Sequence, residues 1–415
     1  MAEGKPQYTE EPSVPAKRID ILDFVRALAI IHIIMYHYYL EWFKGSFLVL
    51  PEGILANLPR LEVFKDGGVL GALKNIFSFL FVYGFTSVNL FLLLSGFVLT
   101  YSLLSKAAKG ARTKWIGFLW KRLKRVLIPF YISVVIGIGF LYLRNFVFPV
   151  MGAAPVYTLI DCVKLLFVPF VFFDIKFLQL FNGDYWFVPL ILQLYLVFPL
   201  LYWGLKKFGP WKLLAGAFIV TVVYRFIAAA YLESVPMGVI YPAKNSYYMF
   251  SFFLPRLFEF ALGMALAYWH FNRANFLDRA TCLLCVAVGL VFSFSGFVLN
   301  MYSWGWPFSD LVVAGGLFFL FIGIAKKLDG KRVHGRFMNA ISGASYEIFL
   351  LHHYFLNYFL MPLIMTLGLQ NETGFWLFMP VFFLGSVLIG EGGWTISRMV
   401  ESTPGKKQQP SAFVS

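Results

Sequence analysis

Ten apolar stretches of about 20 residues each constrain this sequence more than any other feature. A helix needs about 20 apolar residues to cross the hydrocarbon core of a bilayer, which is about 30 Å thick. A soluble fold is disfavoured because 60% of the residues are hydrophobic and only 13% are charged, whereas a water-facing surface needs more polar groups. We therefore predict an all-α, polytopic membrane bundle of about ten transmembrane helices over residues 19–400. The predicted spans are Ile19–Leu40, Gly84–Leu104, Val126–Phe146, Tyr185–Leu205, Lys212–Leu232, Phe250–His270, Asp278–Leu299, Phe308–Lys326, Ser342–Met365 and Phe375–Met399.

The distribution of Lys and Arg predicts how these spans are oriented. Of the 35 basic residues, 24 fall in the tails and in every second loop, 8 fall in the alternate loops, and 3 lie inside spans. Cytoplasmic loops carry the excess of Lys and Arg, so both termini are predicted to be cytoplasmic. Residues 1–18 and 401–415 are then cytoplasmic tails, and the first is predicted to be disordered. Residues 159–173 are too short and too charged for a further span and are interpreted as a re-entrant or interfacial segment.

The net charge of +14 would by itself suit a nucleic-acid-binding protein. The basic residues collect, however, on the predicted cytoplasmic loops, where membrane proteins are expected to carry them. We therefore expect membrane lipids, and no nucleic acid, as partners. The three cysteines have no metal-ligand spacing, so the sequence predicts neither a disulfide framework nor a metal site.

Ionisable residues inside the spans are the first candidates for function, because a charge in hydrocarbon is costly unless it has a partner or a task. In the first span, Arg26 and His37 are eleven residues apart, which is close to three helical turns and about 16 Å along one face. A structural interpretation is also open. Arg26 would then pair with Asp23 at i, i+3, and His37 would be a hydrogen-bonded histidine near the membrane surface.

Two later spans carry further ionisable residues. The ninth contains Glu347, His352 and His353. Successive residues point about 100° apart on a helix, so we expect at most one of these histidines to face a given cavity squarely. Alternatively, they satisfy the backbone carbonyls of broken helices. In the sixth span, Arg256 and Glu259 are spaced i, i+3 and could simply neutralise each other.

The predicted cytoplasmic loop 105–125 holds eight basic residues and ends in a dense cluster directly before the third span. This basic cluster consists of Lys121, Arg122, Lys124 and Arg125. It could orient the span through positive charge. It could also bind the phosphates of a nucleotide-like ligand, to which Arg donates paired hydrogen bonds, or anionic lipid headgroups.

Six motifs resemble, in order, those of the acyltransferase family 3 membrane proteins. Arg26 and His37 match the Arg-x10-His signature of the family's first helix. Together the motifs span residues 18 to 360 and fit the family's ten-helix core. The other five are LFLLLSGF at 90–97, FLWKRLKRVLIPF at 118–130, YWFVPLILQLYLVFP at 185–199, PRLFEFALG at 255–263 and SYEIFLLH at 345–352.

The resemblance implies an integral-membrane O-acyltransferase of the plasma (inner) membrane. Such a protein passes an acyl group, commonly acetyl, from cytoplasmic acyl-CoA to an acceptor, often a hydroxyl of a surface carbohydrate. It further implies catalytic roles for His37, Arg26 and His352, with acyl-CoA bound by Arg26 and the basic cluster and with no metal. A neutral His37 would take the hydroxyl proton or carry the acyl group transiently. Further candidates within or beside the motifs are Asp23, Trp186, Gln193, Tyr195, Arg256, Glu259, Glu347 and His353.

Two departures limit what the resemblance transfers. Many members carry a Glu pair directly before the glutamine of the fourth-helix motif, where this chain has Ile191 and Leu192. Asn89 stands where an acidic residue is frequent. Roles that depend on those charges therefore do not carry over.

A transporter or flippase for a lipid-linked sugar or small solute is the alternative class, because it also needs intramembrane charges and broken helices. The sequence does not identify the acceptor, the acyl chain or the oligomeric state, and a homo-oligomer is left open.

Overall fold

The computed structural model of the chain describes residues 20–149, 158–167, 175–240, 248–273, 276–328 and 335–402. This part of the chain consists of α-helices, short 3₁₀ or π-helical segments and two isolated β-bridges. The tails predicted at 1–18 and 401–415 lie outside it, except for Glu401 and Ser402. The helices are α1 Asp20–Trp42, α2 Ile54–Leu61, α3 Gly68–Val82, α4 Ser87–Ala108, α5 Trp115–Val147, α6 Leu159–Phe167, α7 Ile175–Phe181, α8 Phe187–Phe208, α9 Pro210–Ala230, α10 Leu257–Asn272, α11 Phe276–Arg279, α12 Cys282–Asn300, α13 Ser309–Leu328, α14 Arg336–Gly343, α15 Ser345–Phe355, α16 Met361–Thr366 and α17 Glu372–Glu401.

Within the described residues, nine helical segments are long and apolar enough to cross a membrane, and they coincide with nine of the ten predicted spans. The prediction of an all-α polytopic bundle is confirmed. The remaining prediction, Phe250–His270, corresponds to the shorter helix α10, which has 16 residues. This helix begins late because a 3₁₀ turn with Pro255, Leu254–Arg256, precedes it.

The third span also needs a correction. We expected the helix to begin at Val126 and the basic cluster to lie in the loop before it. In the structure α5 begins at Trp115 and runs for 33 residues. The basic cluster therefore lies on the helix itself, because Lys, Arg and Leu are good helix formers and extend it beyond its apolar part.

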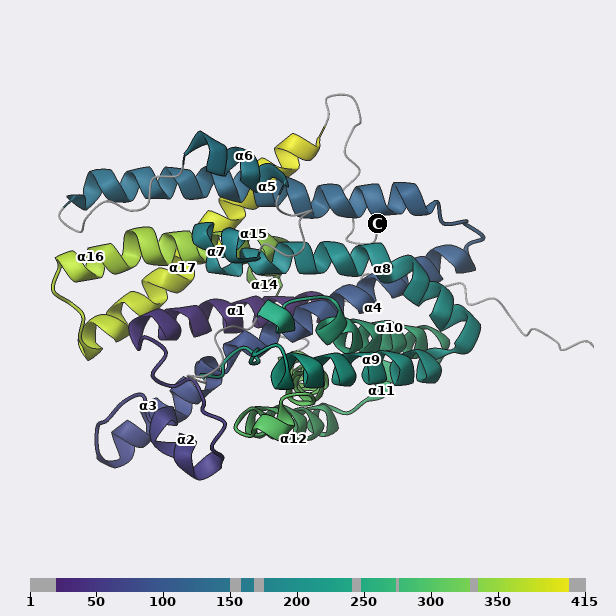
Figure 1. Cartoon of the computed structure of the whole chain (residues 1–415), viewed down its shortest axis with the longest axis horizontal. Coiled ribbons are helices and arrows are strands. Elements are labelled where there is room, and N and C mark those ends of the chain that lie inside the picture. The colour runs from purple at the N-terminus through teal and green to yellow at the C-terminus, as the bar shows by residue number, and fades with distance from the viewer. Residues whose placement is uncertain are drawn as a thin grey trace, which may run out of the picture.

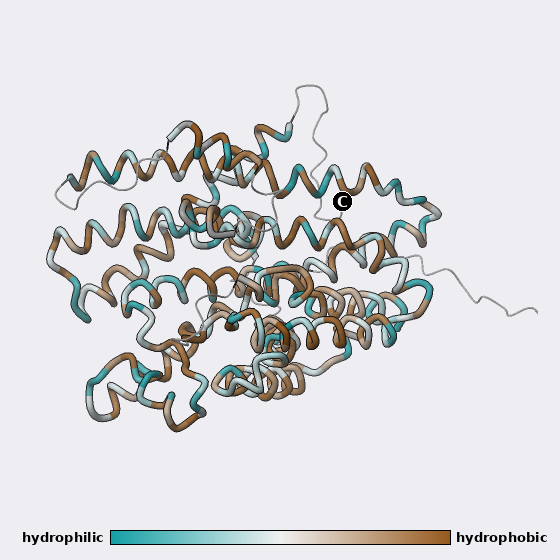
Figure 2. Tube along the Cα trace, viewed as in Figure 1, coloured by the Kyte–Doolittle hydropathy of each residue, from teal (hydrophilic) through white to brown (hydrophobic). Residues whose placement is uncertain are grey.

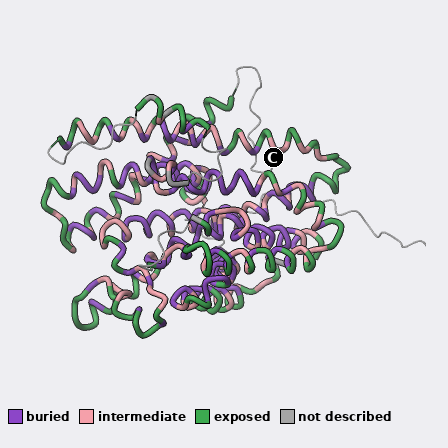
Figure 3. The backbone as a smooth tube through the Cα atoms, in the orientation of Figure 1, coloured by how far each residue is buried: buried purple, intermediate pink, exposed green. Residues whose placement is uncertain are grey.

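The long helices run roughly side by side, with α1 in the centre (Figure 1). α1 packs against α3, α4, α13, α14, α15 and α17, and buried residues concentrate along it and its neighbours (Figure 3). We call the end of the bundle where α4 passes into α5 the basic end; it lies on the right in Figure 1. Apolar residues cover most of the long helices between their ends (Figure 2). Exposed ones on the outer helices, such as Phe226 and Leu283, suit contact with lipid.

α4 and α10 approach each other at backbone distance. A Cβ atom at Gly96 would lie 2.1 Å from the Phe260 carbonyl oxygen, and one at Gly263 would lie 1.9 Å from the Leu93 carbonyl oxygen. Small residues at such positions are typical of tightly packed membrane helices. The pair therefore forms a rigid part of the bundle.

Two segments outside the predicted spans are helical. Residues 41–83, predicted as a loop, contain α2 and α3, and α3 is fastened by ion pairs of Lys74 with Asp66 and Glu372. α6, the described part of the predicted re-entrant segment 159–173, has nine residues. Tyr131, in the middle of α5, donates a hydrogen bond to the Leu166 carbonyl at 2.7 Å. α6 therefore lies beside the middle of α5 and is too short to span a membrane.

Candidate active site

A break in the helical backbone holds an acidic residue inside the bundle. The chain leaves α7 at Phe181 and passes through a 3₁₀ turn, η4 Gly183–Trp186, before α8 begins. Asn182 fixes this turn: its side-chain oxygen accepts from the Asp184 N–H at 2.9 Å, and its amide donates to the Leu350 carbonyl at 2.8 Å. Irregular backbone at membrane depth needs such cover by protein. Asp184 is consequently only 3% exposed.

Three histidines surround the Asp184 carboxylate, and we call these four residues the histidine cluster. His37 comes from α1, and its Nε2 lies 3.5 Å from Oδ1 of Asp184. His352 and His353 come from α15; Nε2 of His352 lies 3.3 Å and Nδ1 of His353 lies 3.0 Å from Oδ2. The expectation that at most one of the two neighbouring histidines could face one site squarely is wrong, because the two rings reach the carboxylate with different nitrogen atoms.

The hydrogen bonds of the cluster fix the protons of two rings. Nδ1 of His352 lies 3.0 Å from the Ile348 carbonyl, which can only accept, so Nδ1 carries the hydrogen. In the neutral ring Nε2 of His352 then has a lone pair, which accepts from Nδ1 of His37 at 2.9 Å. The neutral His37 ring is therefore left with a lone pair on Nε2, the atom nearest Asp184.

The histidine cluster lies toward the end of the bundle opposite the basic end. α1 ends at Trp42, five residues after His37, which is about 8 Å along the helix. The side chains of His37 and His353 are 11% and 16% exposed, whereas His352 is fully buried. A π-helical segment, Leu356–Leu360, follows the histidines, and such segments are frequent at functional sites.

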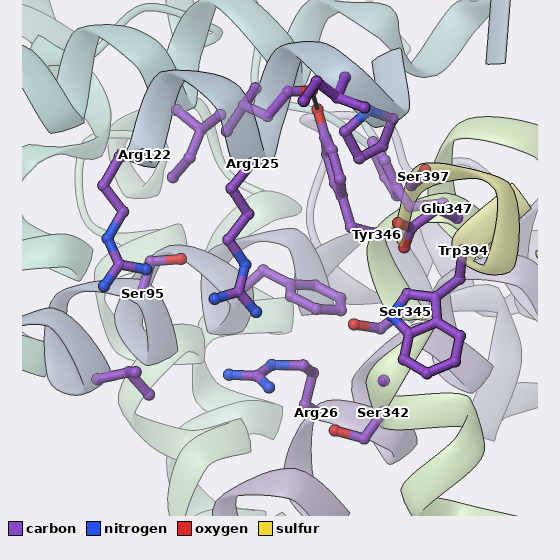
Figure 4. Close-up of a pocket in the computed structure, with 18 of the residues that line it drawn as sticks. Arg26, Ser95, Arg122, Arg125, Ser342, Ser345, Tyr346, Glu347, Trp394 and Ser397 are labelled. Atoms are coloured by element: carbon purple, nitrogen blue, oxygen red, sulfur yellow. Dashed lines mark hydrogen bonds between the residues drawn. The ribbon is translucent and has the colours of Figure 1, made fainter. Parts of the chain in front are cut away.

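A cavity of about 1010 Å³ lies at the basic end of the bundle. Its walls come from α1, α4, α5, α8, α14, α15 and α17. In Figure 4, Arg26, Arg122 and Arg125 point into one space, which the hydroxyl groups of Ser95 and Ser345 also face. The cavity therefore combines cations with uncharged hydrogen-bonding groups, and four acidic residues, Asp23, Glu347, Glu391 and Glu401, line it as well.

All four residues of the basic cluster line this cavity. Arg122 is the most buried of them, and its guanidinium lies over the Phe118 ring, 5.4 Å from the centroid. Arg26 lines the cavity as well, while its Nη1 lies 3.3 Å from Oδ1 of Asp23. The structure thus shows the ion pair of the structural interpretation and, at the same time, places Arg26 where a ligand can reach it.

Of the other candidates from the fourth and ninth spans, two line the cavity and two are buried elsewhere in the bundle. Tyr195 and Glu347 line the cavity. Trp186 is buried in the turn η4. The side-chain oxygen of Gln193 accepts from the Phe253 N–H at 3.1 Å, so Gln193 links α8 to the segment that precedes α10.

An aromatic pair in the cavity wall contacts the histidine cluster. Phe187 and Phe349 both line the cavity, and their ring centroids are 5.3 Å apart in an edge-to-face arrangement. The Phe349 ring also lies 6.2 Å from the His352 ring. Among the described residues that line the cavity, none belongs to the histidine cluster. Arg26 therefore lines the cavity whereas His37 does not, and Phe349 is in contact with both the cavity and His352.

Arg256 and Glu259 lie in a separate ion cluster, whose other members are Asn89, Arg225 and Asp310. Arg225 Nη2 contacts Glu259 at 2.8 Å and Asp310 at 3.0 Å. Arg256 Nη1 contacts Asp310 at 2.8 Å and donates to Asn89 at 2.5 Å. All five residues are buried. Their two positive and two negative charges compensate each other, which supports the interpretation that Arg256 and Glu259 are structural.

Sequence reasoning missed Asp184, Asn182, Arg225 and Asp310. Asp184 directly precedes the predicted start of the fourth span, so we assigned it to a loop. Arg225 and Asp310 were visible as charges inside apolar runs, and that signal could have found them. Their partners could not be inferred, because Arg225 and Asp310 are 85 positions apart in the sequence.

Apolar helices long enough to span a membrane, a buried His–Asp cluster and a cation-lined cavity define a multi-pass integral membrane protein with groups suited to acyl transfer. The family model described as Acyltransferase domain, that of acyltransferase family 3, matches residues 19–390, and the chain belongs to this family. The protein is thus a membrane acyltransferase. No curated protein and no solved structure gives a significant match.

Proposed function

We propose that this protein transfers an acyl group, acetyl in the simplest case, from cytoplasmic acyl-CoA to a hydroxyl of an acceptor that arrives from the other side of the membrane. The acceptor class is a cell-surface or lipid-linked carbohydrate, and the location is the plasma (inner) membrane. One observation carries the proposal: Phe187 and Phe349 form an aromatic pair in the wall of a cavity with many cationic residues, and Phe349 also contacts His352 of the His–Asp cluster.

The cavity suits the donor because coenzyme A carries several phosphates on one end of a long, flexible arm. Arg122 and Arg125 can donate paired hydrogen bonds to phosphate oxygens, which Lys cannot do with the same geometry. Arg26 lies deeper along α1 and faces the same space. In this assignment the basic cluster binds the phosphates of coenzyme A, and Arg26 contacts its flexible arm. The thioester at the end of the arm then reaches the aromatic pair.

The histidine cluster suits the acceptor hydroxyl. Nε2 of His37 has the lone pair needed to take its proton, because Nδ1 donates to His352. Asp184 lies 3.5 Å from the same nitrogen and stabilises the imidazolium that forms. The partly exposed His37 and His353 mark the side from which the acceptor enters.

In the transfer, the acceptor oxygen attacks the thioester carbonyl carbon while Nε2 of His37 takes the hydroxyl proton. The carbon–sulfur bond breaks, and coenzyme A leaves as a thiolate. The thiolate then receives the proton from the His37 imidazolium. The products are the ester and free coenzyme A, so that atoms and charges balance.

His37→Gln tests the proposal, since glutamine keeps a hydrogen-bonding side chain of similar size without a basic nitrogen. Removing a general base is expected to lower turnover by about 10²-fold or more, with acyl-CoA affinity within a few-fold of the parent. The assay measures free thiol released from acetyl-CoA by purified protein in nanodiscs, with and without a cell-envelope extract as acceptor.

His270→Gln is the matched control, because His270 is a buried histidine of α10 that packs against Phe97. Its turnover should equal that of the parent. Near-parental turnover of His37→Gln would contradict the catalytic assignment. A parent that releases no thiol with any acceptor would instead favour a transporter.

A further inference from the structure

We propose that Asp184, His352 and His353 bind a divalent metal ion of the zinc class, with His37 facing the open side of the site. This inference goes beyond acyl transfer and does not depend on it. It rests on the hydrogen bonds, the distances and the anchoring of the histidine cluster. Sequence spacing could not have shown the site, because Asp184 and His352 are 168 positions apart.

The first observation is that the buried Asp184 carboxylate faces imidazole nitrogens. Oδ2 lies 3.0 Å from Nδ1 of His353 and 3.3 Å from Nε2 of His352. Nδ1 of His353 also lies 3.3 Å from Oδ1 of Asn182, so without an ion this nitrogen carries a hydrogen, which a bound metal ion displaces. His352 presents the lone pair of Nε2. A metal ion between these atoms compensates the charge of the buried carboxylate.

The second observation is the spacing of the donor atoms. Zinc binds imidazole nitrogen and carboxylate oxygen at about 2.0 to 2.1 Å in tetrahedral sites, so neighbouring donor atoms are about 3.3 Å apart. Oδ2 of Asp184 lies 3.3 Å from Nε2 of His352 and 3.0 Å from Nδ1 of His353. Each of the four cluster residues offers one donor atom, and these four atoms lie within 4.8 Å of one another. These distances are in the range that one shared ion requires.

The third observation is that the ligands are held from behind. Nδ1 of His352 donates to the Ile348 carbonyl at 3.0 Å, the arrangement that orients most metal-binding histidines. The Asp184 backbone N–H is held by Asn182 at 2.9 Å. Two nitrogens and one carboxylate oxygen form the ligand set of hydrolytic zinc sites that keep a fourth position for water or substrate.

His37 is not counted as a ligand, because it approaches Asp184 with Nε2 and His352 with Nδ1 and cannot offer both to one ion. A bound ion takes the lone pair of His352 Nε2 that otherwise accepts from His37. Filling the site thus changes the hydrogen bond that orients the proposed base.

The test uses full-length, tag-free protein in detergent, stripped with a chelator, loaded with ZnCl₂ and desalted. Mass spectrometry of the metal content is expected to give about one zinc per chain. Cobalt loading should give the visible absorption of tetrahedral Co(II). Asp184→Asn and His353→Gln should each lower zinc affinity by about 100-fold or more, whereas the control His270→Gln should bind as the parent does.

His37→Gln separates this proposal from the proposed function. It should keep the zinc while losing thiol release. A parent without stoichiometric zinc, or Asp184→Asn and His353→Gln proteins that bind zinc as the parent does, would overturn the metal site and leave the acyl-transfer proposal untouched. Loss of zinc in His37→Gln would overturn the open, three-ligand arrangement.

Discussion

The bundle contains two buried polar clusters whose charges are arranged in opposite ways. In the ion cluster, two guanidinium groups meet two carboxylates, and Asn89 fills the remaining gap with a hydrogen bond to Asp310 at 2.9 Å. In the histidine cluster, one carboxylate meets three imidazole rings and no guanidinium or ammonium group is among its ion-pair partners in the described residues. The positive and negative charges of the ion cluster balance each other, whereas the histidine cluster with neutral rings carries one uncompensated negative charge.

We interpret this difference as one between a structural cluster and a cluster proposed to be functional. Removing one partner of a buried, balanced network leaves an uncompensated charge, which costs several kcal/mol. A cluster that is short of positive charge can instead accept a proton or a metal ion during its work. Intramembrane charge alone therefore does not mark an active site; the balance of charge around it does.

The largest effect is expected in the ion cluster. Arg256→Gln leaves Asp310 and Glu259 with one guanidinium in place of two, so unfolding should become easier by about 3–5 kcal/mol. Thermal unfolding of purified protein in detergent measures this as a lowered Tm or as a failure to obtain folded protein. His37→Gln should leave Tm near that of the parent. A stable Arg256→Gln protein without turnover would break the comparison, because the balanced cluster would then serve catalysis.

A second, smaller effect concerns the cavity, which is a third polar region and the one most open to solvent. Replacing both Arg122 and Arg125 with Ala removes two charge-assisted phosphate contacts, and acyl-CoA affinity should fall about 10-fold or more. The part of the loss that comes from the exposed Arg125 should shrink at high salt, because salt screens exposed charges. Isothermal titration with acetyl-CoA measures both.

The matched control replaces Lys109 and Lys114 with Ala. These two substitutions remove the same amount of positive charge at the basic end, but Lys109 and Lys114 do not line the cavity. Equal losses in both double variants would reduce the basic cluster to a determinant of membrane orientation.

The smallest effect is expected at the aromatic pair between the cavity and the histidine cluster. Leu is smaller than Phe, so Phe349→Leu leaves more room for the acyl group. The ratio of butyryl-CoA to acetyl-CoA turnover should therefore rise several-fold, as expected when a pocket gains room for one or two methylenes. Competition between the two donors measures the ratio directly. Phe355→Leu, on the same helix but facing Phe382, is the control. An unchanged ratio would mean that Phe349 does not limit the acyl group.

Much of the fold was predictable because the bilayer imposes a length on every span. Nine predicted spans match helices to within a few residues at most ends, and α5 was misplaced at its start only because a helix continues beyond the hydrocarbon on good helix formers. The helices in residues 41–83 were not predicted, since α2 and α3 are too short to give a membrane signal.

The candidate site was predictable residue by residue but not as an arrangement. His37, His352 and His353 stood out as ionisable groups in apolar runs, and Arg26 stood out through its spacing to His37. Asp184, which joins the three histidines, was missed because it lies in a short 3₁₀ turn beside a span. The sequence also could not show that Arg256 contacts Asp310 or that Arg26 lines the cavity. Side-chain contacts between distant helices leave no local pattern in the sequence.

The aromatic pair also has an electrical consequence. Phe187 and Phe349 are apolar side chains that line the cavity, and Phe349 also contacts the buried ring of His352, so part of a membrane voltage would fall across them. In the proposed reaction, the acyl group is uncharged and crosses this layer without electrical work, but the proton passed from His37 to the thiolate carries one charge. If the basic end faces a cytoplasm that is negative inside, as the distribution of Lys and Arg predicts, the voltage pulls this proton inward by up to about 2.3 kcal/mol per 100 mV. An energised membrane would then drive the proposed reaction toward the ester.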